Sequence, residues 1–178
     1  MSVALAATIL FSSCKKDDPA TAGVNSSATL DAGKAGIMFN SNVNFATSNS
    51  FSLRNTSTTS ATSSTNGTFR IISLTATEVS GTTPIRTADI TITLPSTSST
   101  ANGNIVTDLS GAGSVIADVS LTSNSGATSG TTYDSQSGTL TITKLTATEI
   151  EGTFNTTVNG GGSNTLIISN GSFAGKFQ

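Results

Sequence analysis

Two sixteen-residue segments of this chain repeat each other and constrain its fold more than any other feature. Residues 67–82 read GTFRIISLTATEVSGT and residues 138–153 read GTLTITKLTATEIEGT, with ten identical positions. Both segments begin with alternating apolar and polar residues, which is the pattern of a β-strand with one face in water. The repeat therefore predicts two similar hairpins in an antiparallel sheet.

The alternation also predicts which side chains of the repeat face the core. We expect Phe69 and Ile71 to point inward in the first copy, and Leu140 and Ile142 in the second. The tetrapeptide TATE would form a turn in both copies, with a return strand directly after it. A further strand follows each copy, TADITITL in the first half and SNTLIIS in the second. Each half is therefore expected to be a three-stranded meander.

Other short apolar bursts extend this pattern along the chain. AGIMF, VNF and SFSLR precede the first copy, GNIVTDL and SVIADVSLT lie between the copies, and NGSFAGKF ends the chain. Residues 55–67 are rich in Ser and Thr and are interpreted as an exposed hairpin loop, with a polar edge strand or a glycosylated loop as the alternative. Together these segments predict an all-β, antiparallel two-layer β-sandwich, with a closed β-barrel as the alternative.

The composition excludes several classes of function. The chain has no histidine and a single cysteine, so zinc sites, internal disulfides and Cys/His catalysis are excluded, and no cofactor is expected. Eight basic residues in a chain of net charge −2 give no footprint for nucleic acid. Ser and Thr supply about a third of all residues, which suits strands and turns.

The single cysteine, Cys14, lies between an apolar run and four charges in the sequence LFSSCKKDD. The run from Val3 to Phe11 is much shorter than the roughly 20 residues that span a bilayer, but it has the length of a signal-peptide core. This segment resembles the lipobox of bacterial lipoproteins, in which the cysteine is lipidated and becomes the new N-terminus. The alternative, a buried free thiol, fits poorly with the charges that follow.

The charges after the cysteine, Lys15, Lys16, Asp17 and Asp18, resemble the export signal of surface lipoproteins of Bacteroidota. A solvated spacer is the alternative. The chain is expected to divide into a signal peptide (1–13), a lipidated flexible tether (14–33) and one sandwich domain (34–178).

A second resemblance concerns the end of the chain, GTLTITKLTATEIEGTFNTTVNGGGSNTLIISNGSFAGKF. It is similar to the C-terminal part of small Bacteroidota lipoproteins whose β-sandwich domain has no known function. The resemblance implies location at the outer membrane, anchored by acyl chains such as palmitate and exposed at the cell surface. It implies no catalytic residue.

Few residues are candidates for chemistry or ligand binding. Tyr133 and Asp134 are candidates for contact with a glycan, although a tyrosine packed against the core is the alternative. Glu149 and Glu151 share a strand face, as a glycosidase pair would, but a solvated turn explains them more simply. A further alternative is a calcium site in the loops, with Asp108, Asp118 or Asp134 as a ligand. Another is an ice-binding array of outward threonines, formed by Thr91, Thr93, Thr139, Thr141 and Thr143.

The sequence therefore predicts a membrane-anchored, non-enzymatic binding or structural module. A carbohydrate-binding module and an ice-binding or surface-binding protein are the alternatives, and the ligand is a glycan or a protein of unknown identity.

Overall fold

The structure is a computed structural model that describes residues 26–111, 113–125, 129–162 and 164–178. In this part of the chain no helix is long and apolar enough to cross a membrane. The described residues form one short 3-10 helix and ten strands: η1 (Ser27–Thr29), β1 (Lys34–Phe45), β2 (Ser48–Arg54), β3 (Thr59–Asn66), β4 (Phe69–Ser80), β5 (Thr83–Pro95), β6 (Ile105–Asp108), β7 (Ile116–Ser123), β8 (Thr131–Leu145), β9 (Glu149–Asn159) and β10 (Thr165–Lys176).

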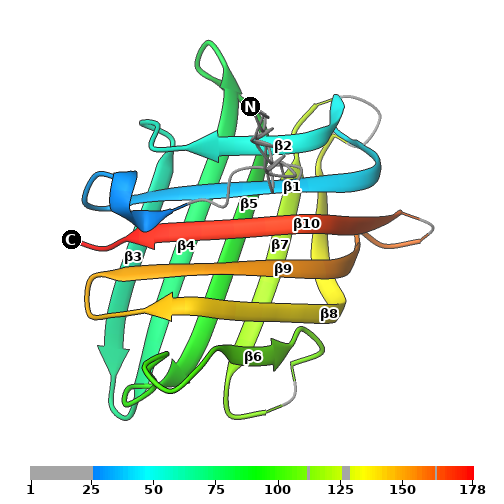
Figure 1. Cartoon of the computed structure of the whole chain (residues 1–178). Coiled ribbons are helices and arrows are strands. Elements are labelled where there is room, and N and C mark those ends of the chain that lie inside the picture. Colours follow the sequence, from blue (N-terminus) through cyan, green and yellow to red (C-terminus); the bar gives the residue numbers. More distant parts are fainter. Residues whose placement is uncertain (1–25, 112, 126–128, 163) are drawn as a thin grey trace, which may run out of the picture.

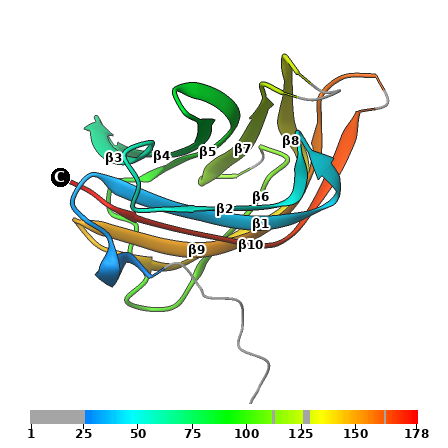
Figure 2. The same cartoon turned by 90° about the horizontal axis from the view of Figure 1, so that it is seen from above.

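All ten strands belong to one antiparallel sheet with the order β2-β1-β10-β9-β8-β7-β5-β4-β3, and β6 pairs with β8 beside this path. The sheet curls over itself, so that β2, β1, β10 and β9 form one layer and β3, β4, β5 and β7 form the other (Figures 1 and 2). The strands of the two layers cross at a steep angle in Figure 1. This arrangement confirms the predicted all-β, antiparallel, two-layer fold, and both layers come from a single sheet.

Strand β8 forms the corner between the layers. Its first residues pair with β7, and the rest pairs with β9. The pairing with β9 shifts register between Ser135 and Ser137 and again between Ile142 and Lys144. Such bulges bend a strand and increase its twist, so one strand can pass from one layer to the other. Between the bulges, Gly138 has a φ of 133° and a Cβ there would lie 2.2 Å from the carbonyl oxygen of Asn155, so this corner requires glycine.

The outer edges of the sheet, β2 and β3, do not pair with each other, so the barrel is not closed. Near one corner β3 contacts the residue before β1 instead, where the Ala61 amide donates to the Gly33 carbonyl at 2.9 Å. Strand β3 comes from the Ser/Thr-rich stretch 55–67, so the loop interpretation of that stretch is wrong and the edge-strand alternative is confirmed. Its polar residues suit an edge that is exposed to water.

The core lies between the two layers and is built by the predicted alternation. The rows Ala88, Ile90, Ile92, Leu94 and Ala117, Val119, Leu121 are buried, and they lie at every second position of β5 and β7. Aromatic side chains fill the centre, where Phe39 stacks on Phe51 with ring centroids 5.0 Å apart. The core is therefore continuous along the whole curled sheet.

The two copies of the repeat depart from expectation in different ways. In the second copy Leu140 and Ile142 are fully buried as predicted. In the first copy the prediction is wrong, because Phe69 is 48% exposed and Ile72 and Leu74 face the core instead. The inward face of β4 is fixed by its register with β5, which places Ile72 opposite Ile92 and Leu74 opposite Ile90.

The predicted TATE turn is also correct only in the second copy. There the Thr146 amide donates to the Glu149 carbonyl at 2.9 Å, between β8 and β9. In the first copy TATE lies inside the continuous strand β4, and the hairpin turn comes later, at Gly81 with a φ of 62°. The predicted return strand after the first TATE is therefore absent from the structure, since β5 begins only at Thr83.

Candidate functional site

The sequence-predicted site residues have separate positions in the molecule. Cys14 and the charged residues Lys15, Lys16, Asp17 and Asp18 lie outside the described residues. Tyr133 is 2% exposed and meets the Phe45 ring edge-on at 6.2 Å, so its ring offers no free face to a sugar. Asp134 lies on the outer face of β8 and accepts a hydrogen bond from the Ser120 hydroxyl at 2.9 Å. Tyr133 is therefore a core residue, as the alternative interpretation of the sequence had it, and its ring does not contact a ligand.

The residues suggested for a calcium site and for a threonine array do not come together in the structure either. In the described residues no group of three acidic side chains is placed to hold a metal ion. Thr91 and Thr93 lie on β5, whereas Thr139, Thr141 and Thr143 lie on β8, and β7 separates these strands in the sheet. The predicted threonine rows therefore do not form one array.

Glu149 and Glu151 take part in a cluster that we call the N-terminal clasp, formed by Ser26, Ser27, Lys144, Glu149 and Glu151. Lys144 Nζ lies 2.6 Å from Glu149 Oε2 and 3.5 Å from Glu151 Oε1. Glu151 Oε1 accepts hydrogen bonds from the Ser27 amide at 2.8 Å and from the Ser27 hydroxyl at 2.5 Å. The two carboxylates thus serve to fix residues 26 and 27 on the sheet.

The electrostatics of the clasp follow from these contacts. The hydrogen bond from Lys144 lowers the pKa of Glu149 below its usual value, and the same contact raises the pKa of Lys144. For Glu151, burial works to raise the pKa, but the Ser27 hydroxyl and amide together with Lys144 outweigh it, so the pKa is lowered. Both carboxylates are therefore held in their charged form.

The clasp fixes the place where the N-terminal segment meets the domain. Ser27 is fully buried, Leu30 is 3% exposed, and Arg54 Nη2 donates to the Ser26 carbonyl at 2.7 Å. The helix η1 lies against the outer side of the layer with β9 and β10, opposite the layer with β4 and β5 (Figure 2). The ordered domain therefore includes residues 26–33, which belong to the predicted tether.

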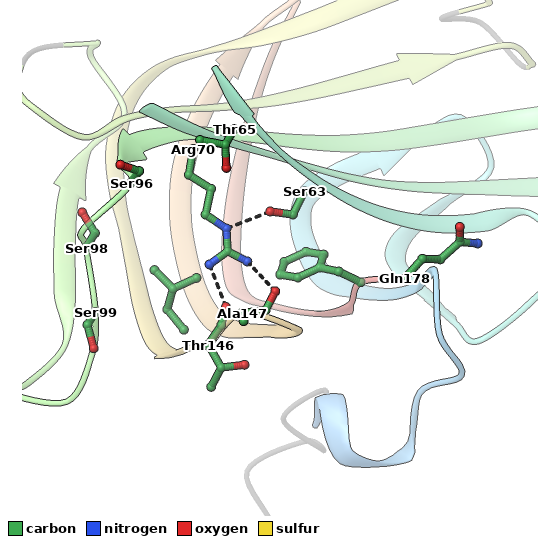
Figure 3. A pocket seen from close by; sticks show the side chains of 11 residues that line it. Ser63, Thr65, Arg70, Ser96, Ser98, Ser99, Thr146, Ala147 and Gln178 are labelled. Carbon is green, nitrogen blue, oxygen red and sulfur yellow. Dashed lines mark hydrogen bonds between the residues drawn. The ribbon is translucent and has the colours of Figure 1, made fainter. Parts of the chain in front are cut away.

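A polar pocket opens at one end of the two layers, and we call it the Arg70 pocket (Figure 3). Its volume is 510 Å³, within the range typical of small-molecule sites. It is lined by Ser63, Thr65, Arg70, Ser96, Ser98, Ser99, Leu145, Thr146, Ala147, Phe177 and Gln178. Strand β3, the start of β4, the segment after β5, the β8–β9 turn and the C-terminus all contribute, so the pocket depends on the complete fold.

Arg70 occupies the centre of this pocket. Its Nε donates to the Ser63 hydroxyl at 2.7 Å, and its Nη atoms donate to the carbonyls of Thr146 and Ala147 at 2.7 and 3.1 Å. The guanidinium carbon lies 5.0 Å from the centroid of the Phe177 ring. Partial burial lowers the pKa of Arg70, because removal from water disfavours the charged form.

Sequence reasoning found neither Arg70 nor Lys144 as a functional residue. The one available signal for Arg70 was a cation inside the otherwise apolar run FRIIS, in a chain with only eight basic residues. Its partners at Thr146 and Ala147 are 76 and 77 residues away in the chain. No local pattern connects residues at such separations.

Comparison with known proteins does not assign the chain to a family. The chain matches no model of a protein family, no curated protein and no solved structure.

Proposed function

We propose that this chain is a lipid-anchored surface protein of a bacterial outer membrane, and that its domain is a non-enzymatic binding module. The observation that carries the proposal is the sequence LFSSC at residues 10–14, directly followed by KKDD. Cys14 would carry the acyl chains, and each buried CH₂ contributes about 0.8 kcal/mol, so that two or more chains give stable attachment. Lys15, Lys16, Asp17 and Asp18 would direct the protein to the outer face.

The N-terminal clasp supports this arrangement because it sets the orientation of the domain. Twelve residue steps separate Cys14 from Ser26, which span at most about 40 Å when fully extended. The domain would therefore remain near the bilayer, held through the layer with β9 and β10. The layer with β4 and β5, on the opposite side from η1, would face the surroundings.

Carbohydrate binding is the second candidate for the activity of the module. The Arg70 pocket favours it, since hydroxyl side chains supply most of its lining. Hydroxyl groups and backbone carbonyls are suitable hydrogen-bond partners for a sugar.

Metabolic labelling with a fatty-acid analogue tests the anchor. We expect label in the wild-type protein and none in Cys14→Ala, because the thiol is the attachment atom. Ser13→Thr is a matched control that leaves the cysteine in place and should retain the label. Equal label in wild type and Cys14→Ala would contradict the proposed anchor.

Protease treatment of intact cells tests the membrane face. Wild-type domain should be digested, whereas a variant with alanine at residues 15–18 should be labelled but protected inside the envelope. A solvated spacer predicts equal digestion of both proteins, so that outcome would remove the export role of the four charged residues.

A further inference from the structure

Two arginines cover the two ends of the core, and their partners differ. Arg86, on β5, is 5% exposed and forms an ion pair with Glu78 while also donating to the carbonyls of Phe45 and Ser48. Arg70, near the other end of β4, donates to a hydroxyl and two carbonyls. Among the described residues no carboxylate lies within ion-pair distance of Arg70, the terminal carboxylate included.

The positive charge of Arg70 is thus solvated by neutral oxygens alone. Its three hydrogen bonds use one N–H on each nitrogen, and a guanidinium has five, so two donors on the Nη atoms remain available. A hydrogen bond from a guanidinium N–H to a carboxylate is charge-assisted and about twice as strong as one between neutral groups. The arrangement around Arg70 therefore leaves room for one anionic group.

The walls of the Arg70 pocket indicate what else this anion would carry. The hydroxyls of Thr65, Ser96 and Ser98 lie around the pocket, and Ser96 and Ser98 come from the segment that faces Arg70 (Figure 3). Arg70 is the only charged side chain among the described residues that line the pocket, and no carboxylate forms an ion pair with it. A ligand with hydroxyl groups beside its carboxylate would use both features.

From this geometry we propose that the Arg70 pocket binds the carboxylate of an acidic sugar, a uronic acid or a uronate at the end of a polysaccharide chain. The proposal rests on the proposed function as a binding module and names its ligand class. Arg70 would hold the carboxylate, and Ser96, Ser98 and Thr65 would contact the sugar hydroxyls.

The test uses the full chain with Cys14→Ala, which can be purified without lipid, and titrates it with D-glucuronate, D-glucose and acetate. Glucuronate should bind at least tenfold more tightly than either of the others, because glucose lacks the charge and acetate lacks the hydroxyls. Arg70→Met retains an apolar contact with Phe177 and should weaken glucuronate binding at least tenfold. Arg54→Met removes an equal charge in the clasp region and should leave the affinity unchanged.

A second variant covers the case in which Arg70→Met does not fold. Ser98→Glu places a carboxylate in the wall of the pocket, leaves the three protein contacts of Arg70 in place, and should also weaken glucuronate binding at least tenfold. Equal affinity for glucose and glucuronate, tighter binding of acetate, absence of glucuronate binding at millimolar concentration, or unchanged affinity in Ser98→Glu would each overturn the proposal. These outcomes are independent of Cys14 labelling, so the ligand and the anchor can fail separately.

Discussion

The two copies of the repeat, residues 67–82 and 138–153, share ten of sixteen residues but form different structures. The first copy is a single strand that ends in a hairpin turn at Gly81. The second is the end of one strand, a turn and the start of another, and the equivalent glycine, Gly152, lies within β9. Nearly identical local sequences therefore adopt different conformations in one molecule.

The residues that follow each copy explain the difference. After Gly152 comes Phe154, which is 1% exposed, so the chain must continue as a strand that buries this ring. The turn must then come earlier, at TATE. In the first copy β4 stays extended because its side chains have partners on β5, where Thr75 donates to Asp89 at 2.6 Å and Glu78 pairs with Arg86. Context outside the repeat thus decides where each hairpin turns.

The largest expected effect compares the first apolar residue of each copy. Leu140 is fully buried whereas Phe69 is 48% exposed. Leu140→Ala should therefore lower the free energy of unfolding by about 3 kcal/mol through lost burial and a cavity, and Phe69→Ala should change it by less than about 1 kcal/mol. Urea unfolding of both variants measures the difference. Equal losses would mean that the two copies bury the same face.

The equivalent glycines provide the next comparison. A Cβ on Gly152 would lie 2.3 Å from both the Phe173 ring and the Thr141 carbonyl oxygen, so Gly152→Ala should cost about 2 kcal/mol. A Cβ on Gly81 would meet nothing within 4 Å, and its φ of 62° alone should make Gly81→Ala cost about 1 kcal/mol. Thermal unfolding would rank the two variants, and a reversed ranking would contradict the assigned turn.

The equivalent glutamates should differ by a smaller amount. Glu78 pairs with Arg86, whose side chain is 6% exposed, whereas Glu149 pairs with Lys144, whose side chain is 38% exposed. Glu78→Gln leaves a buried cation without its anion and should cost about 1.5 kcal/mol, reduced from the fully buried case by the exposure of Glu78. Glu149→Gln should cost about 0.5 kcal/mol. Unfolding at low and high salt would separate them, since only the exposed pair should weaken strongly with salt.

The smallest expected effect is a pH dependence carried by the second copy. The pKa values of Glu149 and Glu151 are lowered in the folded state, so their stabilisation is present above the unfolded value of 4.5 and is lost as the pH falls through the lowered values. The free energy of unfolding should decrease with acidification below about pH 4.5, and Lys144→Met should flatten this slope. An unchanged slope in Lys144→Met would show that the clasp does not carry the effect.

Local sequence pattern predicted the strands well wherever a strand buries one face along its whole length. The rows on β5 and β7 are the clearest cases, because Ile90, Ile92 and Val119 alternate with polar residues and need no further information. The pattern failed on β4, where Phe69, Ile71, Ile72 and Leu74 supply apolar residues to both faces. The choice between the faces was then made by the neighbouring strand β5.

The candidate sites were less predictable than the fold because they join distant residues. The clasp connects Ser27 with Glu151 over 124 residues. For Tyr133 the sequence left glycan contact and packing against the core both open, and the contact with Phe45, on a distant strand, decides for the core.

By itself, the sequence determined the all-β class and the antiparallel arrangement, since both depend on short-range periodicity. Only the tertiary structure decided which face of β4 is buried, where each copy turns, and which arginine has a carboxylate partner. The physical reason is that burial and ion pairing depend on neighbours brought together by the curled sheet. Arg70 and Arg86 are both single cations on neighbouring strands, and only their surroundings distinguish a neutralised charge from an available one.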